Sequence, residues 1–127
     1  MSALLLDTGA FVAVDRGDRA MAARLRMAER SGLELRSTGV VVAEVWRDER
    51  GRQAHLARLL KAVDVRAVDE RLGREAGVLL GKADVTDATD ATVVAVAATG
   101  DCVLTSDPVD LGKLVAASHR SILVVPC

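Results

Sequence analysis

Short apolar runs alternate along the chain with longer segments in which apolar residues recur every three or four positions. The short runs predict strands at residues 3–6, 33–36, 65–68, 102–105 and 122–125. The longer segments predict helices, and the clearest covers residues 18–30, where Met21, Leu25 and Ala28 share one face. Regular alternation of the two kinds of element favours an α/β protein with a mostly parallel central sheet flanked by helices.

Capping residues and apolar stripes divide the rest of the chain. Gly100 is predicted to end the helix that Asp87 opens, because glycine commonly terminates helices. The remaining helices are predicted after Thr38, over the apolar stripe of residues 56–63, after Asp69 and over residues 108–117. At 127 residues the chain is long enough to bury a core, and we expect a single domain over residues 1–127.

Four acidic residues that lie beside apolar residues are the main candidates for a functional site: Asp7, Glu44, Asp90 and Asp107. Asp7 and Asp107 follow predicted strands, and ligands usually bind at the carboxyl edge of an open α/β sheet. Because an isolated buried charge costs free energy, we expect all four carboxylates to turn inward and share a cation. Oxygen ligands suit Mg²⁺ or Mn²⁺, which predicts metal-assisted hydrolysis of a phosphate ester.

Neighbouring acids leave the third position of this set open to a register error. Asp84, Asp87 and Asp90 are spaced three residues apart, and we choose Asp90 because an apolar helix follows it directly. Asp87 and Asp110 are second candidates close to the main set. Each acid singly has a structural explanation, because aspartate at a helix start caps the helix and interacts favourably with its dipole. Only their grouping at predicted strand ends favours a site.

The distribution of charge suits a polyanionic substrate. Residues 16–74 carry 14 Lys and Arg against 9 Asp and Glu, whereas the rest of the chain carries 3 against 9. A basic half attracts phosphates and an acidic half gathers metal. A solvated helical surface of mixed charge explains any one arginine equally well.

Other chemistries receive less support. His55 and His119 lie in unrelated polar contexts, so we expect both on the surface and no histidine-based catalysis. Cys102 and Cys127 lack metal-site spacing, and a structural disulfide is not expected. With two aromatic residues, a base-stacking platform is not expected either. No apolar run approaches membrane-spanning length, and we expect a cytoplasmic protein without a membrane partner.

The motifs resemble those of PIN-domain ribonucleases, specifically the VapC toxins of bacterial type II toxin–antitoxin pairs. LLLDTGAFVAV is similar to the family's first strand and first acid, and STGVVVAEVWR to the helix with the second acid. DATDATVVAVAATGDCVLTSDPVDLGKL is similar to the long block that carries the third and fourth acids. The resemblance covers nearly the whole chain.

The resemblance implies a PIN-like three-layer fold and an endoribonuclease, dependent on Mg²⁺ or Mn²⁺, that cleaves structured RNA such as transfer RNA. It also implies a VapB-type antitoxin that binds the toxin and blocks its site, and a homodimer. The implied catalytic and metal-binding residues are Asp7, Glu44, Asp90 and Asp107, and the implied supporting residues are Thr8, Asp87, Ser106 and Asp110. Arg47 would contact substrate or antitoxin, with a surface salt bridge as an equal alternative.

Three alternatives remain open at this point. The first is a structure-specific DNA nuclease of the same fold. The second is a non-catalytic binding module, in which the acids are only helix caps. The third is a phosphatase or receiver-type domain with Asp7 as nucleophile, although Gly9 stands where common aspartyl phosphatases have a second aspartate.

Overall fold

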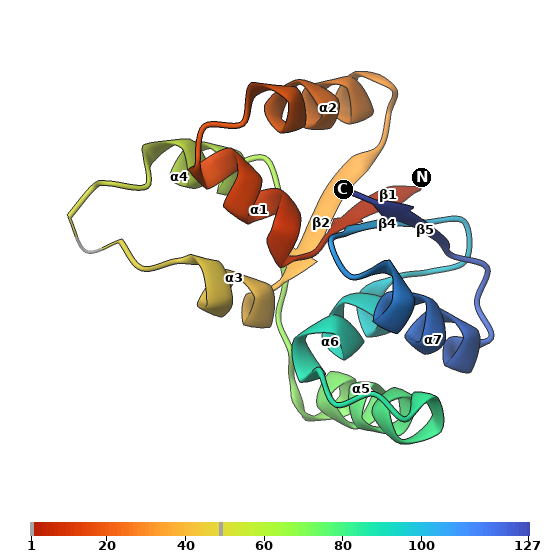
Figure 1. Ribbon diagram of the computed structural model, residues 1–127. Coiled ribbons are helices and arrows are strands. Elements are labelled where there is room, and N and C mark those ends of the chain that lie inside the picture. The colour runs from red at the N-terminus through yellow and green to blue at the C-terminus, as the bar shows by residue number, and fades with distance from the viewer. Residues whose placement is uncertain (1, 49) are drawn as a thin grey trace.

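Five parallel strands form one sheet in the order β3-β2-β1-β4-β5, in a computed structural model that describes residues 2–48 and 50–127 (Figure 1). All neighbouring strands pair in parallel. The strands are β1 (Ala3–Leu6), β2 (Glu34–Thr38), β3 (Asp64–Arg66), β4 (Cys102–Thr105) and β5 (Leu123–Pro126). The predicted α/β class with a parallel sheet is confirmed.

Helices cover both faces of this sheet. They are α1 (Thr8–Asp15), α2 (Arg19–Arg30), α3 (Gly39–Val45), α4 (Ala54–Leu60), α5 (Glu70–Ala83), α6 (Ala88–Val96) and α7 (Pro108–Ser118). Helices α1, α2 and α4 lie on one side, and α5, α6 and α7 pack together on the other (Figure 1). The short helix α3 contacts α1, α6 and β2, so it joins the two helical layers at the carboxyl end of the sheet.

The strand order creates a topological switch point between β1 and β4. From β1 the chain moves outward to β2 and β3, and it then returns to place β4 and β5 on the other side of β1. Right-handed crossovers put the helices of the two halves on opposite faces of the sheet. Open α/β sheets usually bind ligands beyond the carboxyl ends of the strands at such a switch point, which here are β1 and β4.

The core explains why the sheet forms here. All four residues of β1 are buried, as expected for the central strand of a parallel sheet covered on both faces. Phe11 and Leu25 are buried in the first helical layer and Val93 and Leu114 in the second. Each such side chain contributes about 1.5–3 kcal/mol through removal from water.

Most predicted elements are confirmed, with small shifts at their ends. Thr38, Asp69 and Asp87 accept the predicted capping hydrogen bonds. Helix α1 was not predicted as an element, although Asp7 was considered as a helix cap. The prediction that the helix opened by Asp87 continues to Gly100 is wrong, because α6 ends at Val96.

Arg120 explains the early end of α6. Its guanidinium donates to the carbonyl oxygens of Val94, Ala95 and Ala97, at distances of 3.1, 3.1 and 2.9 Å. These carbonyls lie at the end of the helix, where i+4 backbone donors run out, and Val94 also accepts from the backbone N–H of Ala97. Nothing in the local sequence identifies a donor that lies more than twenty residues downstream.

Asp101 is a buried hydrogen-bond acceptor at the amino end of the sheet, away from the candidate site. Its carboxylate accepts from the backbone N–H of Ala3 and of Ala98, both at 2.8 Å, and it is 5% exposed. Arg36 lies 4.0 Å away and offsets its charge. Asp101 therefore ties β1 to the segment that precedes β4.

No helix among the described residues is both long enough and apolar enough to cross a membrane.

We expect Asp101→Ala to lower the free energy of unfolding by about 1–3 kcal/mol, because it leaves the buried N–H of Ala3 without an acceptor. Urea unfolding followed by circular dichroism measures the change. Glu29→Gln, at an exposed position of α2, is the control and should stay within about 0.5 kcal/mol of wild type. Equal midpoints for Asp101→Ala and wild type would contradict the assignment.

Candidate functional site

Asp7 lies directly after β1 and caps α1. It is 2% exposed, and both of its carboxylate oxygens accept hydrogen bonds. Oδ1 accepts from the backbone N–H of Thr8 at 2.7 Å, and Oδ2 accepts from the hydroxyl of Thr105 at 2.8 Å. The first predicted acid is therefore held rigidly at the carboxyl end of the central strand.

Thr105 links the first acid to the fourth. It is the last residue of β4 and is fully buried, and its hydroxyl also accepts from the backbone N–H of Asp107 at 2.9 Å. Asp107 caps α7 and is half-buried. Thr105 is not among the residues predicted from the sequence. The available signal was a hydroxyl at the end of an apolar strand, two residues before a candidate acid.

Asp90 enters the same region from the first turn of α6. It is 4% exposed, and its Oδ2 is buried without a hydrogen-bond partner among the described residues. Burial, followed by the charges of Asp7, Asp87 and Asp107, raises the pKa of Asp90 to about 8. The carboxyl is thus protonated at neutral pH unless a cation approaches. Asp90 is thus the acid on which the charges of the other three act.

Glu44 differs from the other acids, because it lies on α3 and is exposed. The expectation that all four carboxylates turn inward is wrong for Glu44 and holds only partly for Asp107. Successive helix positions point about 100° apart, so apolar neighbours in the sequence do not bury a residue. Val41 and Val45 face the core from α3, and Glu44 lies at the margin of that face. The hydroxyl of Thr89, on α6, donates to its Oε1.

The predicted supporting residues surround this group with unequal contacts. Asp87 is exposed and caps α6 by accepting from the N–H of Asp90 at 3.1 Å. Asp110 is half-buried, and its N–H donates to Asp107 at 3.4 Å. Thr8 is half-buried and contributes its backbone N–H to Asp7. The side chain contribution of each to a site stays a prediction.

Ser106 and Gly9 make a close contact beside the site. A Cβ atom on Gly9 would lie 2.7 Å from Oγ and 2.9 Å from Cβ of Ser106. The absence of a side chain at position 9 therefore lets the loop after β4 approach the first turn of α1. Ser106 itself is exposed.

Two further predicted residues lie outside the acid group. Asp84 is exposed and ends α5 in a left-handed conformation with φ of 54°. Arg47 is exposed, and its guanidinium donates to the carbonyl oxygens of Ala43 and Trp46 at 2.8 and 2.7 Å. Arg47 thus closes the end of α3, and it forms no ion pair with a carboxylate of the described residues.

A cation suits the chemistry of the acid group, although its carboxylates are not drawn together tightly. In the described part of the chain, no three His, Cys, Asp or Glu side chains lie close enough to hold a metal ion as they stand. Oδ2 of Asp90 nevertheless has no hydrogen-bond partner among the described residues, and the neighbouring acids raise the pKa of Asp90. A cation bound beside Asp90 would therefore be stabilised by these negative charges. None of the ion pairs between described residues involves Asp7, Asp90 or Asp107.

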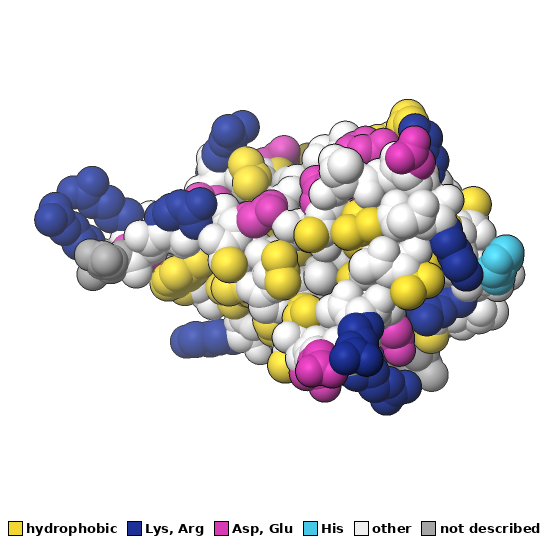
Figure 2. Space-filling view, turned by 90° about the horizontal axis from the view of Figure 1, so that it is seen from below, with side chains coloured by type: hydrophobic (Ala, Val, Ile, Leu, Met, Phe, Trp, Pro, Cys, Tyr) yellow, Lys and Arg dark blue, Asp and Glu magenta, His cyan; other side chains and the backbone are white. Residues whose placement is uncertain are grey.

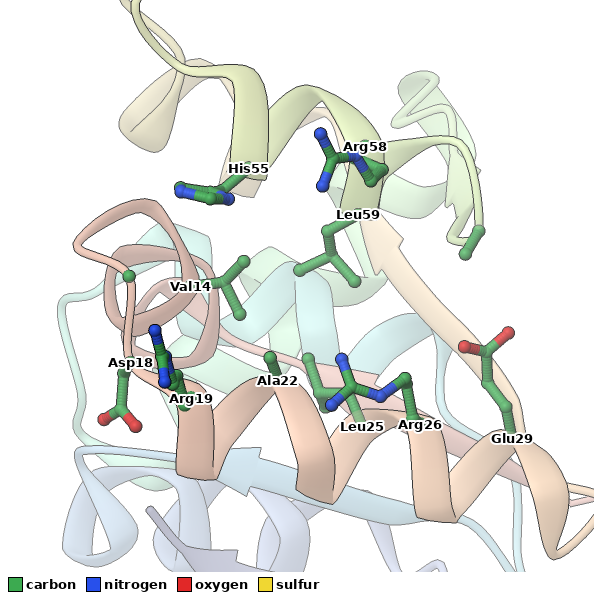
Figure 3. A pocket seen from close by; sticks show the side chains of 12 residues that line it. Val14, Asp18, Arg19, Ala22, Leu25, Arg26, Glu29, His55, Arg58 and Leu59 are labelled. Carbon is green, nitrogen blue, oxygen red and sulfur yellow. The ribbon is translucent and has the colours of Figure 1, made fainter.

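The cavity shown in Figure 3 is separate from the acid group. It measures about 520 Å³ and lies between α2 and α4, with Val14, Leu25 and Leu59 at its floor and Arg19 and Arg58 at its rim (Figure 3). None of the four acids lines it. A shallower hollow of about 550 Å³ borders Thr8, Gly9 and Ser106 and so adjoins the acid group.

Comparison with solved structures identifies the fold. A chain of VapBC2 from Rickettsia felis, in a crystal structure bound to a DNA fragment from the promoter, matches with a TM-score of 0.72 at 11% sequence identity and covers 98% of each chain. The fold is PIN-like. A chain of FitAB bound to an IR36 DNA fragment matches with a TM-score of 0.60 at 16% identity, and the match covers 97% of this chain and 94% of that one.

These matches confirm the predicted PIN-like fold and, at the level of fold, the resemblance to VapC-type PIN domains. No protein-family model matches the sequence, and no curated protein matches it. The sequence identities are low, so the roles of individual residues rest on the geometry described above.

We expect Asp90→Asn to stabilise the protein at pH 8 and to have little effect near pH 4. The folded state holds the Asp90 proton up to a pKa of about 8, whereas the unfolded state releases it near the ordinary value of 3.8. Wild type should therefore lose stability as pH rises between these values, and asparagine removes that loss because it cannot ionise.

Urea unfolding between pH 4 and pH 9, without divalent metal, measures this difference. Asp84→Asn is the matched control, because Asp84 is exposed and asparagine tolerates its left-handed backbone. Parallel pH profiles for wild type and Asp90→Asn would contradict the raised pKa.

Proposed function

We propose that this protein is a metal-dependent endoribonuclease that acts as the toxin of a type II toxin–antitoxin pair. The observation that carries the proposal is the convergence of Asp7, Asp90 and Asp107 at the topological switch point of a PIN-like sheet. Asp90 has a buried carboxylate oxygen without a partner there, which a cation would satisfy. Groups with such perturbed pKa values cluster at functional sites.

In this proposal Asp7, Glu44, Asp90 and Asp107 bind Mg²⁺ or Mn²⁺. Such an ion, when bound, supplies positive charge to the scissile phosphate and its leaving oxygen. The protein's own part is to hold the carboxylates in place. Thr105 and the Thr8 amide hold Asp7, and burial in the first turn of α6 directs Asp90 toward Asp7 and Asp107.

RNA is the proposed substrate, because the chain offers charge and few stacking surfaces. Phe11 is fully buried and Trp46 is half-buried, so neither aromatic side chain is freely available to a base. The protein would therefore recognise the backbone and shape of a structured RNA, such as transfer RNA. A structure-specific DNA nuclease of the same fold remains the second candidate, and the experiment below compares both substrates.

The segment between α3 and α4 is the proposed site of backbone contact. Its described residues, 46–48 and 50–53, project from the molecule in Figures 1 and 2, and arginine side chains gather on them (Figure 2). Asp48 accepts from the N–H groups of Arg50 and Gln53, and the Gln53 side chain donates to Val45 and Asp15. Arg47, Arg50 and Arg52 are thus presented from an anchored turn that begins directly after the helix of Glu44.

The proposed protein partner is an antitoxin of VapB type. Two of the structural neighbours are chains of VapBC2 and FitAB, whose structures were solved with promoter and IR36 DNA respectively. By analogy, we propose that this chain forms a complex with a cognate antitoxin that covers the acid group, and that the toxin itself is a homodimer.

We expect the purified protein to cleave structured RNA with Mg²⁺ or Mn²⁺ and to leave duplex and flap DNA intact. EDTA should abolish cleavage, and Asp7→Asn should lower the rate by at least about a hundredfold, since even the partners of metal ligands contribute 10–100-fold. Gel analysis of defined transfer RNA and DNA substrates measures both effects. Asp84→Asn is the control and should cleave like wild type.

Cleavage of DNA in preference to RNA would support the second candidate instead. Equal cleavage by wild type and Asp7→Asn would show that the activity does not come from this site.

We expect the Arg50→Ala/Arg52→Ala double variant to bind RNA more weakly and with a shallower dependence on salt. The slope of log affinity against log salt should fall in magnitude by about 0.7–0.9 for each lost phosphate contact, from the single-stranded to the duplex value. Fluorescence anisotropy in an Asp7→Asn background measures binding without cleavage. Lys82→Ala, an exposed change on α5, is the control. An unchanged salt slope would place the RNA elsewhere.

A further inference from the structure

Glu44 is the acid whose position the fold explains least. It lies in the last turn of a seven-residue helix and is exposed, whereas Asp7 and Asp90 are almost fully buried. A glutamate side chain has three rotatable bonds, and an exposed one samples several rotamers. Some other group must direct it if it is to act with the buried acids.

Thr89 is the group in contact with it. Thr89 is 6% exposed, and its hydroxyl donates to Oε1 of Glu44 across 45 positions of the sequence. It directly precedes Asp90 in the first turn of α6. One turn of helix therefore places the Asp90 carboxylate among the buried acids and a hydroxyl on the Glu44 carboxylate.

A second hydroxyl contact fixes the other end of α3 to α6. Thr38, the N-cap of α3, lies 3.0 Å from the hydroxyl of Thr92, and Thr92 donates to the carbonyl oxygen of Thr89 at 2.7 Å. Since Thr38 and Thr92 are also buried, α3 cannot slide along α6 without breaking buried hydrogen bonds. The backbone of α3 is held near its start, and Thr89 then acts on the side chain near its end.

We propose that Thr89 is a positioning residue for Glu44, and that its hydroxyl holds the Glu44 carboxylate so that it binds the same divalent cation as Asp7, Asp90 and Asp107. This inference rests on the proposed function. A carboxylate that accepts one hydrogen bond keeps lone pairs for a cation, and hydrogen bonds to ligating carboxylates tune metal affinity. The hydroxyl is neutral, so it orients the carboxylate without cancelling the charge that the cation requires.

Four variants test the role of the hydroxyl: Thr89→Val, Thr89→Ser, Glu44→Gln and the Thr89→Val/Glu44→Gln double variant. Valine keeps the shape of threonine without the hydroxyl, and serine keeps the hydroxyl. Mn²⁺ affinity, measured by electron paramagnetic resonance on the intact protein, is the first readout. Metal-dependent RNA cleavage, compared as kcat and KM, is the second.

We expect Thr89→Val to weaken Mn²⁺ affinity on the order of tenfold and to lower kcat with little change in KM for RNA. Thr89→Ser should bind Mn²⁺ like wild type. In the Glu44→Gln background, Thr89→Val should have no further effect, because its only route to the metal has been removed.

Three results would overturn the assignment: wild-type affinity in Thr89→Val, no recovery in Thr89→Ser, or an undiminished effect of Thr89→Val in the Glu44→Gln background. Thermal unfolding in EDTA separates a general loss of stability from a loss of positioning, and Thr89→Ala replaces Thr89→Val if the latter does not fold. Absence of Mn²⁺ binding and cleavage in wild type would instead refute the proposed function and, with it, the role of Thr89.

Discussion

The burial of two carboxyl groups at one edge of the sheet is the constraint on which the rest of the structure depends. Asp7 and Asp90 come from segments more than eighty residues apart, and each is almost fully buried. Asp7 is satisfied by two hydrogen bonds, but Asp90 keeps an oxygen without a partner and a raised pKa. The apolar layers on both faces of the sheet must offset this electrostatic cost. Stability alone would favour an apolar residue at position 90, so the cost itself indicates function.

Among the described residues, threonine hydroxyls, and not Lys or Arg side chains, contact the carboxylates of Asp7 and Glu44. Thr105 donates to Asp7 and accepts from the backbone N–H of Asp107, and Thr89 donates to Glu44. A lysine or arginine at these places would form an ion pair and lower the carboxylate pKa values. Its positive charge would then take the place of an external cation. A neutral hydroxyl fixes geometry and leaves the negative charge uncompensated. Asp7 is thereby held in place and still attractive to an external cation.

The parts of this arrangement that follow from local pattern were predictable, and the parts that depend on distant contacts were not. Strand ends and helix caps are local signals, so Asp7 and Asp107 were correctly expected at the carboxyl edge. The burial of Glu44 was wrongly expected, because apolar neighbours in a helix do not share its direction. The partner of Thr89 lies 45 residues away and that of Thr105 lies 98 residues away, and no single-sequence pattern pairs them.

Helix capping and the binding of a cation are compatible explanations of the same acids. Asp7, Asp87 and Asp107 cap α1, α6 and α7, so three helix N-termini converge on one edge of the sheet. The positive ends of these helices lower the cost of gathering carboxylates there, and each cap orients its own side chain. A cap commonly engages one carboxylate oxygen, as Asp107 does with Oδ1, and the second oxygen remains free. The convergence follows from strand order, from α1 and α7, which begin directly after β1 and β4, and from the packing of α6 against α7. The fold itself recurs in a solved structure that shares only 11% of its residues with this chain.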